Sequence, residues 1–154
     1  IRRFVRATPS AALRIFDVNL RQDFYTDEII RESLEWANVL KLNDEELDTV
    51  IPDDGRPLRA RLRSLLTRYE LKLVVLTRGA QGALLVVDEM SVDYEGRSMT
   101  VRDTVGAGDA YTAVVALGLL QGSQLHDIAA LASKVAGYVC TQAGATPPLP
   151  EGLI

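Results

Sequence analysis

The stretch at 103–111, Asp-Thr-Val-Gly-Ala-Gly-Asp-Ala-Tyr, places two glycines and a carboxylate at the start of a predicted helix. Residues 110–120 are almost continuously apolar and rich in Ala and Leu, which indicates a buried helix. Small residues at 106–108 let the backbone approach a ligand, and first-turn N–H groups with the helix dipole favour an anion such as a phosphate. Asp109 can cap this helix, or it can accept a proton from a hydroxyl held beside the phosphate. The residues alone leave both roles open.

Two better-known phosphate loops do not match this stretch. The sequence has no GxxxxGK[ST] motif and therefore no P-loop, and a dinucleotide fingerprint needs a glycine where Tyr111 stands. A short Gly-Ala-Gly before a buried helix can also be tight packing alone, with Asp109 a solvated first-turn acid. The companion motifs elsewhere in the chain favour the phosphate site.

The string DTVGAGDAY resembles the C-terminal signature of the ribokinase-like (PfkB) carbohydrate kinases, whose pattern is close to D-T-x-G-A-G-D. Three other stretches resemble further motifs of that family, in the same order. FDVNLR at 16–21 is similar to the fructokinase-type D-x-N-x-R strand end, LKLNDEE at 40–46 to N-x-x-E, and LTRGAQGAL at 76–84 to T-x-G-x-x-G. Within the family, the chain is most similar to the bacterial fructokinases. The resemblance covers nearly all 154 residues and corresponds to the family's C-terminal half.

This resemblance implies phosphoryl transfer from MgATP to a sugar hydroxyl, with fructose indicated by the FDVNLR stretch. Asp109 would orient the hydroxyl and accept its proton. The N–H groups of Gly106, Ala107 and Gly108 would form an anion hole that stabilises charge on the γ-phosphoryl group. The strand end that carries Asn19 and Arg21 would lie near the sugar or its phosphate.

The resemblance also implies a set of ATP neighbours, namely Asn43, Thr77, Gly79, Gly82 and Ser133. Two residues depart from the pattern of many relatives, because Ser133 stands near a usual Asn and Gln142 near a usual basic residue.

Metal sites are implied as well. Asn43 and Glu46 lie three residues apart and so on one side of a helix start, where Glu46 could hold a magnesium-bound water. The alternative is that Asn43 simply caps the helix, with the acids in its first turn. A K⁺ site built from backbone oxygens near Asp103, Val105 and Gly144 is the other metal site that the family implies.

Strands alternate with helices along the chain, which predicts an α/β layered sheet. The family fold is a layered α/β/α ribokinase-like fold, with a mostly parallel central sheet and helices on both faces. We expect helices to begin at Thr26, Pro57 and Gln124, the last ending at Gly144, and an extended segment at 98–102. The expected strands lie at 13–18, 37–42, 71–76 and 82–88.

Composition excludes several classes of function. The net charge of −4 argues against general nucleic-acid binding, and no apolar run reaches membrane-spanning length. We therefore expect a cytoplasmic protein. His126, the single histidine, is expected at the surface, and Cys140, the single cysteine, is expected in the core. The helix after Pro57 carries arginines that we expect to form a solvated face: Arg59, Arg61, Arg63 and Arg68.

The chain's length bears on its organisation. Residues 1–154 correspond to the nucleotide-binding and catalytic portion of the family, without the N-terminal portion that provides the lid and most sugar contacts. We therefore expect a fragment that is inactive alone, and a full-length protein that can form a homodimer. Two alternatives stay open, a truncated non-catalytic nucleotide-binding module and a kinase of the same fold that acts on a nucleoside or another sugar.

Overall fold

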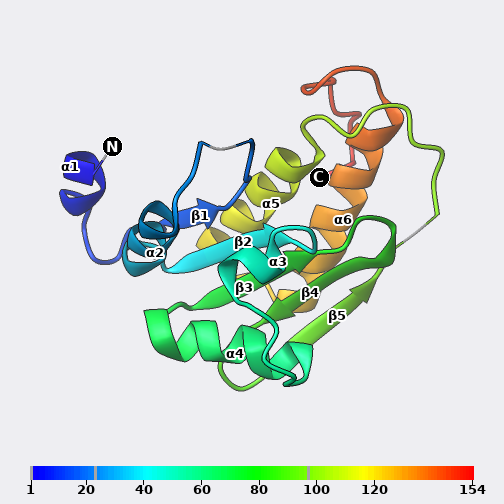
Figure 1. Cartoon of the computed structure of the whole chain (residues 1–154). Coiled ribbons are helices and arrows are strands. Elements are labelled where there is room, and N and C mark those ends of the chain that lie inside the picture. Colours follow the sequence, from blue (N-terminus) through cyan, green and yellow to red (C-terminus); the bar gives the residue numbers. More distant parts are fainter. Residues whose placement is uncertain (1, 23, 97) are drawn as a thin grey trace. The chain divides into compact units, whose positions relative to one another are not determined.

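The computed structural model describes residues 2–22, 24–96 and 98–154. The chain forms two compact units (Figure 1). The first unit consists of Ile1–Thr77 and Leu84–Ser91, and the second of Arg78–Ala83 and Val92–Ile154.

The strands form a five-stranded sheet in the order β1-β2-β3-β4-β5, which is also their order along the chain. β1 pairs with β2 and β2 with β3, both in parallel, so that Asp17 lies opposite Lys41 and Asn43 lies opposite Thr77. The strands are β1 (Ile15–Asp17), β2 (Val39–Asn43), β3 (Leu73–Thr77), β4 (Gly82–Val86) and β5 (Ser91–Glu95). The helices are α1 (Arg2–Arg6), α2 (Asp27–Trp36), α3 (Leu47–Val50), α4 (Leu58–Tyr69), the 3₁₀ turn η1 (Gly79–Gln81), α5 (Ala107–Gln121) and α6 (Leu125–Thr141).

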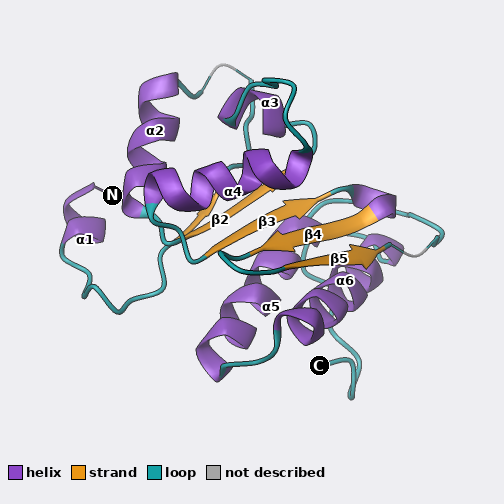
Figure 2. Ribbon diagram, turned by 90° about the horizontal axis from the view of Figure 1, so that it is seen from below, coloured by secondary structure: helices purple, strands orange, loops and turns teal. Residues whose placement is uncertain are grey.

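In the first unit, α2 and α4 cover one face of β2 and β3 (Figure 2). Thr26 caps α2 by accepting a hydrogen bond from the Ile29 N–H at 3.2 Å, and the acids Asp27 and Glu28 in the first turn suit the helix dipole. One apolar core joins the two helices to alternate residues of the strands; its fully buried side chains include Leu34, Leu40, Leu42, Leu62, Val74, Leu76 and Leu84.

One arginine of α4 does not lie on the solvated face that the sequence predicted. Arg59, Arg63 and Arg68 are exposed as expected, but Arg61 is only 6% exposed. Its Nη2 lies 2.7 Å from Asp48 Oδ1 and 2.5 Å from the Ile51 carbonyl oxygen. The expectation fails because Arg61 stands one turn from Leu58 and from Leu65, at the edge of the apolar stripe, where these acceptors compensate for its burial.

In the second unit, α5 and α6 lie side by side (Figures 1 and 2). A short connection joins them at Gly122, which adopts φ 70° as the C-cap of α5. Gly118 of α5 faces Ile128 of α6 so closely that a Cβ would overlap the isoleucine side chain, which explains the small residue at this crossing.

Most elements agree with the sequence-based expectation. The four expected strands correspond to β1–β4, and helices follow Thr26, Pro57 and Gln124. Three details differ: α6 ends at Thr141 rather than at Gly144, residues 98–102 form no strand, and β5 was not predicted. None of the helices in the described ranges combines the length and apolarity that crossing a membrane requires.

Candidate functional site

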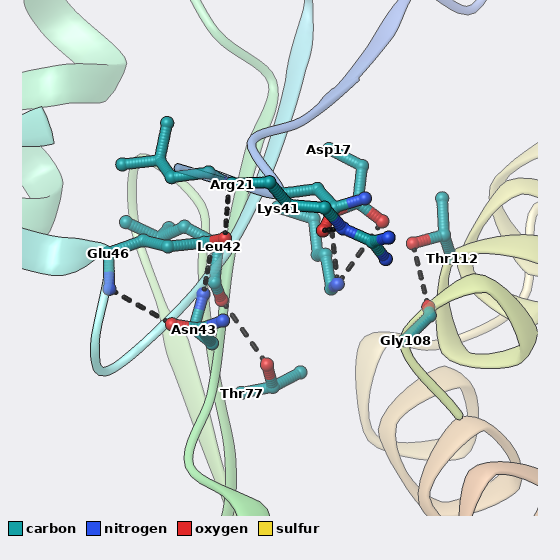
Figure 3. Close-up of polar contacts among 11 residues, drawn as sticks. Asp17, Arg21, Lys41, Leu42, Asn43, Glu46, Thr77, Gly108 and Thr112 are labelled. Carbon is teal, nitrogen blue, oxygen red and sulfur yellow. Dashed lines mark hydrogen bonds and ion pairs between the residues drawn. The ribbon is translucent and has the colours of Figure 1, made fainter. Parts of the chain in front are cut away.

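Polar side chains gather at the carboxyl ends of β1, β2 and β3 in the first unit, where ligands bind in open α/β sheets. We call this group the strand-end cluster; it consists of Asp17, Asn19, Arg21, Lys41, Asn43, Glu46 and Thr77 (Figure 3). Parallel pairing in register brings these residues together, although they come from segments up to 60 residues apart (17 to 77). The cluster includes five of the candidate residues, namely Asn19, Arg21, Asn43, Glu46 and Thr77.

Glu46 is the most buried carboxylate of the cluster, with 6% of its surface exposed. Its Oε1 accepts a hydrogen bond from the Leu20 N–H at 3.0 Å, and its Oε2 accepts one from the Asn43 N–H at 2.9 Å. Asn43 Oδ1 in turn accepts the Glu46 N–H at 2.9 Å. These reciprocal bonds have the pattern of a capping box, but they close the turn at 44–46. Asn43 ends β2, and α3 begins at Leu47 with Glu46 at its N-cap, so the expected helix start at Asn43 was wrong.

A buried ion pair lies beside Glu46. Lys41 Nζ lies 2.9 Å from Asp17 Oδ1 and 3.1 Å from Oδ2, and the lysine and aspartate side chains are 9% and 22% exposed. Because the lysine is held on both carboxylate oxygens, the pair fixes the end of β1 against β2. Lys41 was missed by the sequence reading, although a charge within the apolar run Val-Leu-Lys-Leu is a signal that could have revealed it.

The loop after β1 is tightly turned. Asn19 and Gln22 both adopt left-handed backbone conformations, with φ 45° and 49°. Arg21 Nε donates to Asn19 Oδ1 at 3.2 Å, so the two candidate sugar or phosphate neighbours contact each other. On β3, the Thr77 hydroxyl donates to the Leu42 carbonyl at 3.3 Å.

The second unit carries the other candidate residues. We call residues 103–109 the glycine loop; it leads into α5, whose N-cap is Gly106. Gly106 has φ 83°, and a Cβ there would overlap the carbonyl oxygen of Ala145. The position therefore admits only glycine, both because of its backbone conformation and because another backbone segment lies against it.

The first turn of α5 offers hydrogen-bond donors. Ala107 N–H donates to the Thr104 carbonyl at 3.3 Å, whereas the N–H groups of Gly106, Gly108 and Asp109 have no acceptor among the described residues. Asp109 is exposed in this same turn. Of the three expected anion-hole donors, Gly106 and Gly108 are thus available to an incoming anion, and Ala107 is already engaged.

Asp103 joins the glycine loop to the segment after α6. Its Oδ1 accepts the Val105 N–H at 3.0 Å and its Oδ2 accepts the Gly144 N–H at 3.1 Å. The hydrogen bonds from Val105 and Gly144 hold the pKa of Asp103 below its ordinary value. This side chain is therefore an anchor for the loop.

The lowered pKa of Asp103 makes the anchor dependent on pH. The carboxylate form stabilises the loop above its ordinary pKa, and this contribution is lost as the pH falls through the lower pKa of the folded state. We expect the amide NMR signals of Val105 and Gly144 to shift together below about pH 4. In Asp103→Asn both shifts should disappear, and independent movement of the two signals in the unmodified chain would contradict the anchor.

Gly79 and Gly82, the two glycines of the 77–82 stretch, lie at the start of η1 and just after its end. Gly82 has φ 91°, and a Cβ there would overlap the carbonyl oxygen of Tyr94, so only glycine fits. Gly79 has φ 51° with open space around the position of a Cβ. Gly82 is thus required by its own turn, while Gly79 leaves room for a ligand to approach.

The candidate ATP neighbour Ser133 lies on α6 with its hydroxyl buried. Neither Ser133 Oγ nor the hydroxyl of Tyr111 on α5 has a hydrogen-bond partner in the described part of the chain. Burial raises the pKa of Tyr111 to about 12, and the neighbouring Ser133 hydroxyl opposes this shift. The two hydroxyls are thus close enough to interact with each other, although neither completes a hydrogen bond within the described residues.

Three backbone carbonyl groups belong to the expected cation site, two in the glycine loop and one after α6. The carbonyl oxygens of Asp103, Val105 and Gly144 accept no hydrogen bond from the described residues, as a monovalent cation held by backbone oxygens would require. Within the same ranges, no group of three or more His, Cys, Asp or Glu side chains could hold a metal.

Replacing Gly106 by Ala should damage the glycine loop. The variant combines a positive φ with overlap on the Ala145 carbonyl, so we expect a loss of at least about 1–3 kcal/mol in folding free energy and loss of phosphate binding. Gly122→Ala is the matched control, because it shares a positive φ of 70° but has nothing within 4 Å of the new Cβ. Urea unfolding of both variants checks this, and equal losses would show that the Ala145 contact has no effect.

Comparison with known proteins identifies the family of the chain. The family model for "pfkB family carbohydrate kinase" matches residues 4–152. A fructokinase of Salmonella thompson is 32% identical over 121 residues, covering 75% of this chain and 54% of that protein. The chain therefore spans about half the length of this curated relative.

Solved structures show the same fold. The crystal structure of a ribokinase from Thermotoga maritima matches with a TM-score of 0.75 at 20% identity, over 93% of this chain and 46% of that one. A fructokinase double mutant from Vibrio cholerae O395, bound to fructose, ADP and a potassium ion, matches with a TM-score of 0.70 at 26% identity, over 85% and 45%. The fold is ribokinase-like, and the chain belongs to the pfkB family of carbohydrate kinases.

Proposed function

We propose that this chain is the nucleotide-binding and catalytic portion of an ATP-dependent sugar kinase, with fructose as the acceptor. The observation that carries the proposal is the start of α5, where an exposed Asp109 stands next to the open N–H groups of Gly106 and Gly108. A carboxylate beside a phosphate-binding turn is what transfer of a phosphoryl group to a hydroxyl requires. The family match over residues 4–152 supports the same reaction.

In this proposal each group has a defined task. Asp109 orients the sugar hydroxyl and accepts its proton, while the Gly106 and Gly108 N–H groups donate to the γ-phosphoryl oxygens as their charge develops. The proposed nucleotide neighbours are Asn43, Thr77, Gly79 and the α6 residue Ser133. Bound Mg²⁺ would neutralise phosphate charge, and K⁺ would lie at the carbonyls of the glycine loop. Asn19 and Arg21 would lie near the sugar or its phosphate.

Fructose is proposed because curated fructokinases are among the relatives, at 32% identity over 121 residues for the Salmonella thompson protein. The test is coupled ADP production with fructose, ribose, adenosine and no acceptor. It should be run on the 154-residue chain and on the complete gene product that contains it. Turnover by the complete product with fructose alone supports the proposal, whereas a preference for ribose or adenosine refutes the choice of acceptor.

A nucleoside acceptor is the second candidate. It is favoured by the structural match to the aminoimidazole riboside kinase of Salmonella enterica, at 25% identity and a TM-score of 0.70. The adenosine arm of the same assay tests it. ATP binding without turnover on any acceptor would instead favour a non-catalytic nucleotide-binding module, the alternative that the half-length coverage keeps open.

A further inference from the structure

We propose that Arg78 is a positioning residue that fastens the turn around η1 to β5, and so fixes Gly79 where a nucleotide can approach. The consequence for nucleotide binding rests on the proposed kinase function, but the fastening itself does not. The inference comes from the contacts that join residues 78–82 to residues 93–96 within the second unit.

The guanidinium group of Arg78 contacts two segments of the chain. Its Nη2 donates to Asp93 Oδ1 and, in a longer contact of 3.5 Å, to the Gln81 carbonyl oxygen. Asp93 lies on β5, whereas Gln81 is the last residue of η1. A hydrogen bond between a guanidinium and a carboxylate is stronger than one between neutral groups. The Arg78 side chain therefore links the turn to the strand.

The Arg78 side chain is largely enclosed by the protein. It is 19% exposed, compared with 41% for the Asp93 side chain. Its Nε is buried and has no hydrogen-bond partner among the described residues. The hydrogen bonds of Arg78 thus join two segments of the chain, and the residue acts on a ligand through the turn that it holds.

The backbones of the two segments also lie against each other. A Cβ at Gly82 would overlap the Tyr94 carbonyl oxygen of β5. Conversely, a Cβ at Gly96, just after β5, would overlap the Ala80 carbonyl oxygen of η1. Each glycine therefore allows the other segment to approach closely. Arg78 adds a charged link to this backbone contact.

Gly79 is the residue whose position depends on this link. It begins η1 directly after Arg78, with φ 51° and nothing within 4 Å of the position of a Cβ. The Arg78 N–H donates to the Gly82 carbonyl at 2.8 Å, so the turn also closes on Arg78 through its backbone. A turn held in this way presents an ordered backbone to the nucleotide, which lowers the entropy cost of binding.

The first test measures the link without any need for turnover or ligand. Amide hydrogen exchange of the complete gene product is compared for the unmodified protein, Arg78→Gln and Asp93→Ala. We expect exchange of the Gln81 and Gly82 amides, which close η1, to rise about fivefold or more in both variants. Arg63→Gln is the matched control, because Arg63 is an exposed arginine of α4 and its loss should leave both amides unchanged. Unchanged exchange in either variant of the pair would overturn the inference.

The second test asks whether the link acts on nucleotide binding. The ATP KM, the acceptor KM and kcat are measured for the same variants and for the double variant Arg78→Gln/Asp93→Ala. We expect each single variant to raise the ATP KM about three- to tenfold, and to leave the acceptor KM and kcat at saturating ATP within about twofold. The double variant should resemble Arg78→Gln, because the same link is lost in each case.

Two kinetic results would overturn the inference. A fall in kcat with an unchanged ATP KM would do so, because a general loss of folded protein produces the same pattern. Effects of Arg78→Gln and Asp93→Ala that add in full would do so as well, because the two residues would then act separately. An unmodified protein without turnover on any acceptor would refute the proposed function, while the exchange result would still decide the link.

Discussion

Under the proposed function, replacing Asp109 by Asn should lower kcat of the complete gene product by about 10²–10⁴-fold, the range for loss of a general base. The amide cannot accept the proton of the sugar hydroxyl, although it keeps the size of the side chain in the first turn of α5. ATP binding should persist, because the N–H groups of Gly106 and Gly108 remain in place. Coupled ADP production measures kcat, and calorimetric titration with ATP measures nucleotide binding.

Asp127→Asn provides the control for this variant. Asp127 is an exposed aspartate in the first turn of α6, so the substitution makes the same change in charge at the same position of a neighbouring helix. It should leave kcat within about twofold, because exposed substitutions away from a site have small effects. Asp109→Asn with the turnover of the unmodified enzyme would refute Asp109 as the base.

Lys41→Met should destabilise the first unit by about 3–5 kcal/mol, the usual loss when one partner of a buried ion pair is removed. The variant takes both ammonium contacts, at 2.9 and 3.1 Å, from the Asp17 carboxylate, whose side chain is only 22% exposed. The free energy of unfolding from urea titration measures the loss. The double variant Asp17→Leu/Lys41→Met should recover most of it, because an apolar pair removes both charges together.

An exposed ion pair gives the comparison for Lys41. Arg56 lies 2.6 Å from Asp54, but their side chains are 49% and 43% exposed. Arg56→Met should therefore lower the free energy of unfolding much less than Lys41→Met does. Equal losses for Lys41→Met and Arg56→Met would mean that burial does not decide the strength of the Asp17–Lys41 pair.

The sequence predicts those parts of the fold whose signals are local. Thr26, with acids in the turn after it, marks the start of α2, and the apolar run after Gly108 marks α5. β5 was missed because most of its residues are only partly buried and none is fully buried, so that it lacks a clear apolar run. The segment at 98–102 was predicted to be extended because its side chains alternate in character, but it forms no strand.

The residues of the candidate site also fall into those that the sequence predicts and those that it does not. Motif residues such as Asn43, Gly106 and Asp109 could be named because their spacing within a short stretch carries the signal. Lys41 and Arg61 could not be named, because their roles depend on partners in other elements. Lys41 pairs with Asp17 on the neighbouring strand β1, and Arg61 pairs with Asp48 on helix α3. The order of residues along the chain does not show which distant acid will pair with a buried cation.

The order of the strands also bears on how the protein is made. Because β1 to β5 lie in the sheet in the order in which they occur along the chain, each strand leaves the ribosome after the neighbour that it pairs with. At a translation rate of about 5–20 residues per second, the sheet can grow strand by strand during synthesis. The glycine loop is translated after the last strand, so the residues proposed for catalysis are among the latest of the candidate site to emerge.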